Sequence, residues 1–523
     1  MPRPIVTKGA QLCALLLAVV SSFSFGFAQY VNNAAFGTTQ VAPGSLVKIY
    51  WSSLSGAIIS NPQSVHVDFQ PQGSDQLFNA QVLNSAQYPM LVVAPKDIPP
   101  GEATVTLTLD SAVLATTQVR IVPASIGIFS ASGNGLGPAV AQNISNAAPP
   151  VLNQLTSPAL PSQYVTLWAT GLGNFTTPDV TVSIAGKLVQ PSFAGHAPGL
   201  PGVDQINFNV PGDVAFGCYV PVSVSAGNYA SNSVTIALAE AAGACSHPLG
   251  LSADDLLDLD QGGSTFVGSM NFGASISTPG PNLAGYTRFE SFQADFRARD
   301  AFEMFLVSPK LQTGSSASPC GLSNFLGLFL ASRIFSGNAG PSLTLKSPAN
   351  VRVSVPGVFG SEYFFAPDPP PAVATAAELP PPFFEPGPWQ VTAPGGDTVG
   401  AFQQTNELPP QVRWTNRESL TTFSRDGDLR LTWDPQGYSA TDVMNIVFLT
   451  GSLMGISCVA PAQTGELIVP AALLQQIAAG PGSLELYIAS QTPTVFKIPL
   501  TAGGVAPVVI SYGFSNSLAV TVQ

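Results

Sequence analysis

Few residues in this sequence could carry out acid–base or nucleophilic chemistry. The 523 residues include three histidines, His66, His196 and His247. A Ser-His-Asp hydrolase needs such a histidine beside its nucleophile, which α/β-hydrolases place in a GxSxG turn before a helix. No GxSxG turn precedes a helix pattern in this chain, and HExxH and P-loop patterns do not occur. We therefore expect a protein that is not an enzyme, and we assign no catalytic residue, no cofactor and no metal ligand.

The cysteines indicate disulfide bonds. One of the five, Cys13, lies in an apolar N-terminal run, which leaves an even number in the rest of the chain: Cys218, Cys245, Cys320 and Cys458. An even count in an exported protein is typical of disulfides, and four cysteines can pair in three ways. We favour Cys218–Cys245 and Cys320–Cys458, since each pair then belongs to one expected domain. A metal site at Cys245 and His247 is the alternative, but the CxxC and HxxxH spacings of many zinc sites are absent.

Acidic residues leave one enzymatic alternative open. The 30 Asp and Glu residues could supply a pair of carboxylates, as in glycoside hydrolases, although the loops or barrel that usually hold such a pair are not evident. The densest acidic run is 252–260, with the sequence SADDLLDLD. Asp258 and Asp260 resemble part of a calcium loop, but the later ligands are missing. A short helix capped by Ser252, with acids in its first turn, is the plainer interpretation.

The first 28 residues have the pattern of a Sec-type signal peptide. Arg3 and Lys8 precede an apolar run at 12–20, and Ala28 ends a small-x-small cleavage site. No later run reaches the roughly 18 apolar residues of a membrane helix. We expect export, cleavage before Gln29 and no membrane span in the mature protein; an uncleaved anchor is the alternative.

The composition is that of a turn-rich globular protein with few charges. Charged residues make up 9% of the chain, against about 25% in average soluble proteins, while hydrophobic residues make up 45%. This hydrophobic content argues against disorder, and the 49 glycines follow no collagen-like period. The net charge of −12 becomes 16 − 30 = −14 without the two basic leader residues, which argues against nucleic acid as a partner.

Short strand patterns occur along most of the sequence. Runs rich in β-branched residues alternate with clusters of Gly, Pro, Ser and Gln at intervals of roughly 8–12 residues, as in sandwiches and barrels. In the N-terminal part these runs cover 47–51, 65–69, 90–93, 103–109 and 119–122. Long amphipathic helices are nearly absent, so the expected fold class is all-β.

An internal repeat divides the first half of the chain. The segment 43–54 (PGSLVKIYWSSL) aligns with 161–172 (PSQYVTLWATGL), so that Val47 matches Val165. The apolar positions keep the same alternation, as they must where one face of a strand is buried. We predict two copies of one sandwich, at 29–123 and 124–240, followed by a larger β-sandwich region at 241–523.

Several segments of this repeat resemble one family. The start 32–36 (NNAAF), the turn 194–199 (AGHAPG) and the strand 205–211 (QINFNVP) are similar to segments of the Solibacter-type repeat domain of secreted bacterial proteins. The resemblance covers about 30–240 and is looser for the C-terminal half. It implies tandem immunoglobulin-like sandwiches of the IPT/TIG kind and an extracellular location, and it implies no reaction. His196 stands where the family usually has leucine, and we interpret it as an exposed loop residue.

The region 241–523 is also expected to consist mainly of strands. The predicted strands are 342–355, 411–414, 429–433, 443–449, 466–469, 484–489, 495–498, 508–512 and 518–522, with a short helix at 470–477. The spacing of Phe289, Phe292 and Phe296 predicts a helix, and the pattern of 302–307 predicts a strand. We expect both segments to pack in a core. The proline-rich stretch near 366–388 is predicted to be an extended surface insertion.

Three functions remain as hypotheses. The first is a secreted, non-catalytic multidomain protein with a structural, adhesive or spacer role at the bacterial cell surface or in the periplasm. The second is an extracellular carbohydrate-binding protein that stacks sugar rings on a tryptophan, the candidates being Trp51, Trp168, Trp389, Trp414 and Trp433. The third is a glycoside hydrolase or lyase with an unrecognised site. The partners implied are polysaccharides or other surface proteins.

The leader yields a first prediction. Expressed with residues 1–28, the protein should reach the periplasm or the medium and begin at Gln29, because signal peptidase cleaves after a small-x-small site. N-terminal sequencing of the exported fraction measures this. A version without residues 1–28 should stay in the cytoplasm and serves as the control; exported protein that still begins with Met1 would contradict the prediction.

Overall fold

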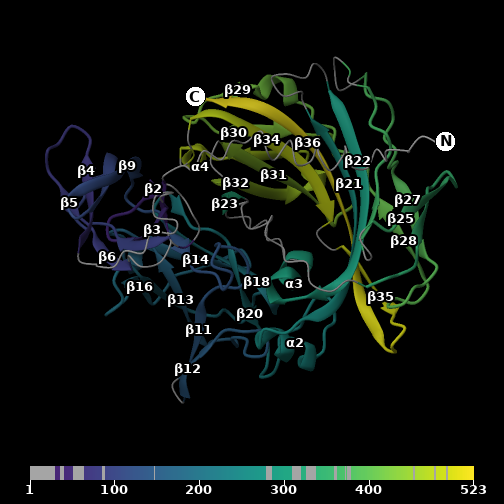
Figure 1. Cartoon of the computed structure of the whole chain (residues 1–523), viewed down its shortest axis with the longest axis horizontal. Coiled ribbons are helices and arrows are strands. Elements are labelled where there is room, and N and C mark those ends of the chain that lie inside the picture. The colour runs from purple at the N-terminus through teal and green to yellow at the C-terminus, as the bar shows by residue number, and fades with distance from the viewer. Residues whose placement is uncertain are drawn as a thin grey trace, which may run out of the picture.

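The computed structural model describes most of the chain beyond the leader. The described residues are 30–33, 35, 40–50, 64–84, 89–145, 148–277, 286–308, 320–324, 337–358, 362–371, 373, 378–450, 454–475, 477, 479–490 and 493–523. The predicted signal peptide at 1–28 and Trp51 lie outside them. Strands dominate the described part, as predicted, and Figure 1 shows three successive bodies coloured purple, blue to teal, and teal to yellow.

The first sandwich packs two sheets face to face. Its strands are β1 (Tyr30–Asn33), β2 (Gln40–Val41), β3 (Leu46–Tyr50), β4 (Val65–Pro71), β5 (Phe78–Asn79), β6 (Gln81–Asn84), β7 (Met90–Val93), β8 (Gly101–Leu109) and β9 (Ala112–Ile121). The sheets have the orders β1-β3-β7-β6 and β2-β9-β8-β4-β5. In β3, Val47 and Ile49 are fully buried and Lys48 between them is half-buried, because successive side chains point to opposite faces.

The second sandwich repeats the first almost strand for strand. Its elements are β10 (Gly127–Ile128), β11 (Ala141–Ser145), β12 (Ala148–Leu152), β13 (Tyr164–Thr170), the 3-10 helix η3 (Thr177–Asp179), β14 (Val180–Ile184), β15 (Lys187–Val189), β16 (Phe193–His196), β17 (Asp204–Asn209), β18 (Gly217–Ala226), β19 (Tyr229–Ala230) and β20 (Val234–Leu238). The order β11-β13-β17-β16 corresponds to β1-β3-β7-β6, and β20-β18-β14-β15 corresponds to β9-β8-β4-β5. The parallel pairing of Val41 with Ile121 also has a counterpart, between Ala159 and Leu238.

The C-terminal region contains one large sheet and a smaller sheet packed against it. Its strands are β21 (Thr265–Ser277), β22 (Thr287–Arg299), β23 (Cys320–Asn324), β24 (Ser342–Lys346), β25 (Arg352–Pro356), β26 (Glu362–Phe365), β27 (Gly387–Ala393), β28 (Phe402–Leu408), β29 (Thr422–Phe423), β30 (Leu429–Thr432), β31 (Asp442–Thr450), β32 (Met454–Pro461), β33 (Glu466–Val469), β34 (Gly480–Ser490), β35 (Thr494–Pro499) and β36 (Val505–Val522). Its helices are α2 (Ala253–Asp260), α3 (Ala301–Val307), α4 (Ala471–Leu474), η6 (Arg417–Leu420) and η7 (Ala462–Thr464).

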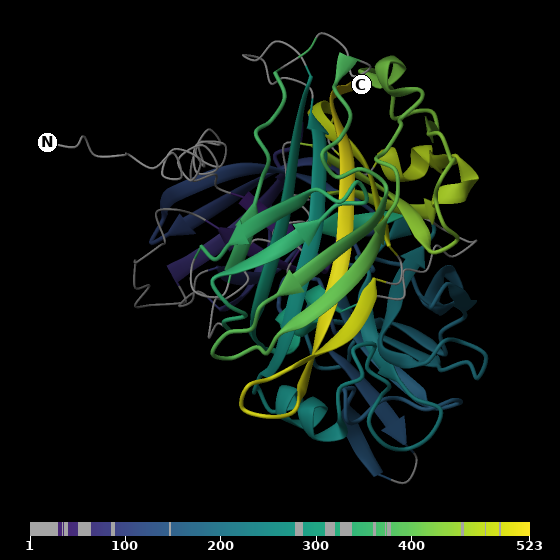
Figure 2. The same cartoon turned by 90° about the vertical axis from the view of Figure 1, so that its right-hand side faces the viewer.

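The long strand β36 lies at the centre of the large sheet, where Figure 2 shows it in yellow. On one edge it pairs antiparallel with β34 and β35, and on the other it pairs parallel with β21 and β29. The sheet continues through β31 and β32 to β23 and, on the other side, through β22 to β26. The smaller sheet has the order β25-β24-β27-β28, and one hydrophobic core includes side chains from both sheets, among them Phe272, Trp389 and Phe514.

Some expected strands have different bounds in the structure. The segment 342–355 is a hairpin of β24 and β25, and the two strands expected at 508–512 and 518–522 are parts of β36. The strand is continuous between those two segments because its backbone pairs with β34 on one edge and with β21 on the other. The buried side chain of Asn516 accepts a hydrogen bond from Arg417 Nε at 2.8 Å. The segment 411–414 forms no named strand, and only Trp414 bridges to Trp433.

The aromatic run at 289–307 also folds differently from the prediction. Phe289, Phe292 and Phe296 lie in the strand β22, and 302–307 lies in the helix α3, so both expected secondary structures were wrong. In a strand, residues four apart share a face, and Phe292 and Phe296 are fully buried. Phe289 faces the other side and is 38% exposed. Asp300 caps α3 by accepting a hydrogen bond from the Glu303 amide, which explains the local preference for a helix.

The proline-rich stretch has a buried downstream end. Phe384 is fully buried, and its ring centroid lies 5.2 Å from that of Trp389 and 5.4 Å from that of Phe272. The buried carboxylate of Glu290 accepts hydrogen bonds from the amides of Phe383 and Phe384, both at 2.9 Å. This end of the stretch therefore belongs to the core; residues 372 and 374–377 lie outside the described part.

The structure contains the two disulfides that the sequence analysis favoured. Cys218 in β18 is joined to Cys245, with their Cα atoms 5.1 Å apart, within the usual range for a disulfide. Cys320 and Cys458 are joined directly across the antiparallel pair β23–β32. The second bridge therefore fastens β23, at one end of the large sheet, to its neighbour.

An apolar cluster joins the second sandwich to the C-terminal region. It contains the disulfide of Cys218 and Cys245 together with Leu256 of α2, Met304 of α3 and Val509 of β36. The segment after β20 is thus held against both neighbours by a shared core. The predicted boundary at 240/241 lies just before this segment.

Removal of the first disulfide should destabilise this part of the chain. Its closed loop spans a sequence separation of 27, for which the chain-entropy argument gives roughly 3 kcal/mol. We expect C218A/C245A to lower the guanidinium concentration at which the second sandwich is half unfolded. Circular dichroism and tyrosine fluorescence measure this unfolding. C320A/C458A, which opens a loop in another part of the chain, is the matched comparison. An unchanged unfolding curve for C218A/C245A would contradict the prediction.

Candidate binding cleft

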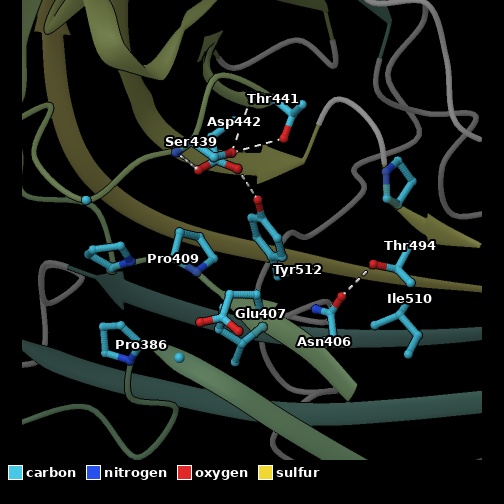
Figure 3. Close-up of a pocket in the computed structure, with 15 residues that line it drawn as sticks. Pro386, Asn406, Glu407, Pro409, Ser439, Thr441, Asp442, Thr494, Ile510 and Tyr512 are labelled. Atoms are coloured by element: carbon cyan, nitrogen blue, oxygen red, sulfur yellow. Dashed lines mark hydrogen bonds between the residues drawn. The ribbon is translucent and has the colours of Figure 1, made fainter. Parts of the chain in front are cut away.

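A cleft opens in the C-terminal region where the pairing partner of β36 changes. β34 pairs with β36 as far as Ala489 and Gly513, and β35 begins its pairing at Thr494 and Ile510, so that Tyr512 lies between the two paired stretches. The end of β28 and the turn before β31 surround this point, as Figure 3 shows. The cleft has a volume of about 530 Å³, which is within the range of small-molecule sites.

A buried carboxylate and a tyrosine form one wall of the cleft. Asp442 is the first residue of β31 and is 4% exposed, and Tyr512 of β36 is 7% exposed. The Tyr512 hydroxyl donates to Asp442 Oδ1, and the backbone amide of Ser439 donates to Oδ2 at 2.6 Å. These hydrogen bonds hold the carboxylate and the phenol in a fixed orientation. Ser439 and Thr441 add two hydroxyls at the rim, 3.0 Å from each other.

An amide side chain lies across the cleft from this wall. Asn406, near the end of β28, is 5% exposed, and its Oδ1 accepts a hydrogen bond from the Thr494 hydroxyl at 2.9 Å. Its Nδ2 has no hydrogen-bond partner among the described residues. Figure 3 shows the hydrogen bond between the Asn406 and Thr494 side chains. A buried donor without a partner is rare in folded proteins.

The mouth of the cleft is acidic and rich in proline. Glu407 is exposed there, and among the described lining residues Glu407 and Asp442 are the charged ones. The remaining apolar surface comes mainly from Pro386, Pro409, Pro410, Pro493 and Ile510. The cleft therefore combines a small number of fixed polar groups with rigid apolar walls.

Three of the tryptophans named in the sequence analysis are buried in the C-terminal core. Trp389, Trp414 and Trp433 are between 1% and 8% exposed and belong to the C-terminal core. Their indole nitrogens donate to Glu385 O, Asn416 Oδ1 and Ala462 O, so their polar edges are satisfied inside the protein. Trp168 in β13 is half-buried. The prediction that these three buried tryptophans stack sugars was wrong because the sandwich core needs their large apolar surfaces.

The acidic run at 252–260 has the structural role that its N-cap predicted. Ser252 and Asp255 form a capping box at the start of α2. Asp260, at the end of the helix, accepts hydrogen bonds from the amides of Leu155 and Thr156. The described residues contain no group of three or more His, Cys, Asp or Glu side chains that could hold a metal ion.

The turn at 194–199, one of the segments that resemble the repeat family, lies near the contact between the first two sandwiches. Thr170, at the end of β13, accepts a hydrogen bond from the Leu46 amide at 2.7 Å and donates one to Gly202 O at 2.6 Å. Gly202 has a φ of +76°, and a Cβ there would lie 3.1 Å from Val93 of the first sandwich. The turn after β16 thus needs glycine both for its backbone angle and for the close approach of the two domains.

His196 belongs to the same contact. Its ring lies over Gly44 of the first sandwich, and its Nδ1 is 2.7 Å from Oδ1 of Asp204. Asp204 is fully buried, and its Oδ2 also accepts the Leu172 amide at 2.8 Å. The hydrogen bond to this carboxylate raises the pKa of His196, although partial burial acts in the opposite direction. The side chain is 56% exposed, as expected, and it is held by a buried partner. The prediction of a loop was wrong, because His196 ends the strand β16 and pairs there with Asp204 of β17.

The other junction contains a second histidine. His247 is buried beside Tyr219, with ring centroids 5.4 Å apart and Nε2 3.3 Å from the tyrosine hydroxyl. Burial lowers the pKa of His247 to about 4. The imidazole is therefore neutral at physiological pH and is part of the packing next to the Cys218–Cys245 disulfide.

Sequence reasoning did not find the cleft. Asn406, Asp442, Thr494 and Tyr512 come from four separate strands, and none of them belongs to a motif. Their proximity follows from the order of strands in the large sheet and its packing on β28. The clustered prolines at 409–410 were the one local signal near the site, and they indicate a turn rather than a ligand.

No family model and no curated protein matches this chain. Similar solved structures include a Ca²⁺-stabilized adhesin of an Antarctic bacterium that binds ice, with 12% identity, coverage of 95% of this chain and 99% of that one, and a TM-score of 0.14. Another is the Bacteroides ovatus protein SGBP-B in complex with a mixed-linkage heptasaccharide (9% identity, 82% and 81% coverage, TM-score 0.14). A third contains domains 5–6 of the S-layer protein SbsC, with 15% identity, coverage of 41% of this chain and 97% of that one, and a TM-score of 0.19. These TM-scores are too low to indicate a shared arrangement of domains.

The pair of His196 and Asp204 yields a pH-dependent prediction. Because the folded-state pKa of His196 is raised, its contribution to stability is fully present below the unfolded pKa of 6.5 and is lost as pH rises through the folded value. We expect His196→Leu to lower the thermal midpoint more at about pH 5.5 than at about pH 8.5. Leucine is the residue that the family resemblance implies at this position.

Asp204→Asn is the matched variant for this test, since it keeps the shape of the side chain and removes its charge. In that background His196→Leu should lose its pH-dependent effect. Equal effects of His196→Leu at both pH values in the otherwise unchanged protein would contradict the coupling.

Proposed function

We propose that this protein is a secreted, non-catalytic protein with an adhesive, structural or spacer role at the bacterial cell surface. The chain is an all-β protein with two tandem immunoglobulin-like sandwiches and a larger C-terminal β region. The observation that carries the proposal is the construction of the two junctions. Backbone and side-chain hydrogen bonds join the first sandwich to the second, and a shared apolar core joins the second to the C-terminal region.

Such junctions suit a protein that presents its domains in a defined order. Interfaces between domains of one chain are often modest and permit motion. Here the Leu46 amide, Thr170 and Gly202 form a partly buried polar contact at the first junction, and the second contains a disulfide. A fixed spacing between a surface and the outermost domain is a useful property for adhesion.

The extracellular location is part of the proposal. The predicted signal peptide supports it, and so do the two disulfides, since structural disulfides persist in oxidising compartments. We also propose that 30–240 is related to the Solibacter-type repeat domain that it resembles. This relationship implies the same extracellular location. Among the described residues, no helix has the length and apolarity needed to cross a membrane.

Carbohydrate binding is the second candidate function, and the cleft favours it. The buried tryptophans 389, 414 and 433 do not supply a stacking surface, so any sugar would bind elsewhere. A glycosidase or lyase is less well supported, because both oxygens of Asp442 already accept hydrogen bonds from Tyr512 and Ser439. The cleft thus has the character of a binding site more than that of a pair of free catalytic acids.

The proposed role predicts attachment without turnover. Microspheres coated with the mature protein should adhere to cells that produce it or to their extracted polysaccharide, whereas albumin-coated microspheres should not. Incubation of the protein with the same polysaccharide should release no reducing ends or unsaturated products. Surface protease treatment of intact cells should degrade the protein. Measurable cleavage of the polysaccharide would refute the role. It would also be refuted if the protein in intact cells resisted the protease and the coated microspheres did not adhere.

A further inference from the structure

We infer that the outer face of the sheet β12-β11-β13-β17-β16, in the second sandwich, binds a chain of an uncharged, hydroxyl-rich polysaccharide. The sheet directs Val165, Leu167 and Ile206 into the core of the domain, so the alternate side chains form the opposite face. Figure 1 labels β12, β11, β13 and β16 in the blue second body. Such binding gives the proposed surface protein a ligand class and rests on that function for its biological setting.

One row of side chains crosses this face from edge to edge. In register across the five strands, it consists of Leu152, Gln142, Thr166, Asn207 and Phe193. At about 4.8 Å per strand the row is roughly 19 Å long. Its middle consists of two amides and a hydroxyl, and its apolar ends are 53% exposed at Leu152 and 36% exposed at Phe193. A ligand lying along the row therefore meets apolar groups at both ends and uncharged polar groups between them.

Asn207 provides an oriented donor in the middle of the row. Its Oδ1 accepts hydrogen bonds from the Thr166 hydroxyl at 2.9 Å and from Gln205 Nε2 at 3.1 Å, and these two bonds fix the amide. Its Nδ2 makes no hydrogen bond to the residues that the structure describes, and it is not among the buried atoms that lack a partner. Since Asn207 is only half-buried, this nitrogen is accessible, and its two N–H groups can donate to a ligand.

The neighbouring amides add acceptors and further donors. Gln205 uses its nitrogen for Asn207, which leaves its Oε1 as an acceptor. Gln142 is half-buried, and its side chain makes no hydrogen bond within the described part of the chain. Hydroxyl groups both donate and accept, so the vicinal hydroxyls of a sugar match this mixed set. An apolar protein surface pressed against the same groups would leave them buried without partners, which is unfavourable.

The charges of the second sandwich favour an uncharged ligand. The sequence has no Asp, Glu, Lys, Arg or His between Arg120 and Asp179, a stretch that includes β11, β12 and β13. The side chains that β17 directs outward are the amides of Gln205, Asn207 and Asn209. A carboxylate or phosphate polymer would meet no cation from this sheet and would be repelled by a chain of net charge −12. A cationic polymer would meet no carboxylate on the face.

Aromatic rings lie beside the polar row. Tyr164 lies two residues before Thr166 on the same face and is 47% exposed. The Phe193 ring leans along β16, since its Cζ lies 3.7 Å from the position that a Cβ on Gly195 would occupy. Aromatic rings of this kind pack against the C–H faces of sugars. The face thus offers stacking at its margin and hydrogen bonds in its middle, as a chain of linked sugar rings requires.

The first sandwich shows that the fold does not require this polar row. In the aligned repeat, Lys48 has the position of Thr166, and it pairs with Leu91 as Thr166 pairs with Asn207. The corresponding row of the first copy therefore contains a cation and an apolar side chain. The hydroxyl and amide are particular to the second copy, and leucine at position 207 is compatible with the fold.

Isothermal titration calorimetry on the mature protein tests the inference. The probes are the neutral oligosaccharides cellohexaose, laminarihexaose, xylohexaose and mannohexaose, the anionic hexagalacturonate and the cationic chitosan hexamer. At least one neutral probe should bind, and the two charged probes should bind more weakly or not at all. Asn207→Leu removes the donors and introduces the side chain of the first copy, and it should weaken binding roughly tenfold or more. Tyr164→Ala removes a ring from the margin and should also weaken binding.

Gln118→Leu and Phe289→Ala are the matched controls. Gln118 is an exposed amide of the first sandwich that is also hydrogen-bonded to a threonine, and Phe289 is a 38% exposed aromatic residue of the C-terminal region. Both variants should bind the neutral probe as the parent protein does. Thermal denaturation shows whether each variant is folded, and if Asn207→Leu does not fold, Gln142→Leu and Tyr164→Ala decide the question.

Three results would overturn the inference: no neutral probe binds, a charged probe binds in preference to all neutral ones, or the variants on this face bind like the parent. Sedimentation velocity identifies the occupant in the first case, since a dimer that Tyr164→Ala dissociates would assign the face to a second copy of the chain. Adhesion and surface exposure are measured separately. Adhesion without saccharide binding would refute the ligand class and keep the proposed function, whereas saccharide binding by a protein that is not at the cell surface would do the reverse.

Discussion

The two edges of β36 both have hydrogen-bonded neighbours, and the C-terminal region is arranged around this pairing. A buried strand must pair its N–H and C=O groups on both sides. β36 does so with the neighbouring segments 480–490 and 494–499 and with the more distant segments 265–277 and 422–423. At Tyr512 the partner on one edge changes from β35 to β34, and the cleft lies at this change. The candidate site is therefore a consequence of how the central strand is paired.

The same pairing determines how the side chains around the cleft are held. Tyr512 points to the buried face of β36, where its hydroxyl meets Asp442. Asp442 is placed by its pairing with Ser490 at the end of β34, and Thr494 begins the strand that follows. Each of these polar groups is satisfied by a neighbour, and only the amide nitrogen of Asn406 is left over. A binding site built from such groups is rigid, because its hydrogen bonds already exist without the ligand.

The two domain junctions use different interactions and respond to pH in opposite directions. At the first, the charged form of His196 is favoured by Asp204, so this contact is strongest in mild acid. At the second, burial lowers the pKa of His247 to about 4, so the unfolded state binds more protons than the folded state between this value and 6.5. The contribution of His247 is complete above pH 6.5 and is lost as pH falls toward 4.

The sequence by itself determined the all-β class and the repeat, and it favoured, among three possibilities, the cysteine pairing that the structure contains. The class and the repeat follow from local information: the alternation of Val47 and Ile49 matches that of Val165 and Leu167, and a one-residue shift would expose the core of either strand. The capped helix after Ser252 is local in the same sense, since its capping box depends on residues three apart.

Only the tertiary structure decided the burial of the tryptophans, the continuity of β36 and the position of the cleft. Phe292 and Phe296 fit the spacing of a helix equally well, and long-range pairing with β21 placed them in a strand. Asn406, Asp442, Thr494 and Tyr512 became neighbours through strand order, which depends on hydrogen bonds between distant segments. No local pattern contains that information, because each of these residues would be ordinary in its own strand.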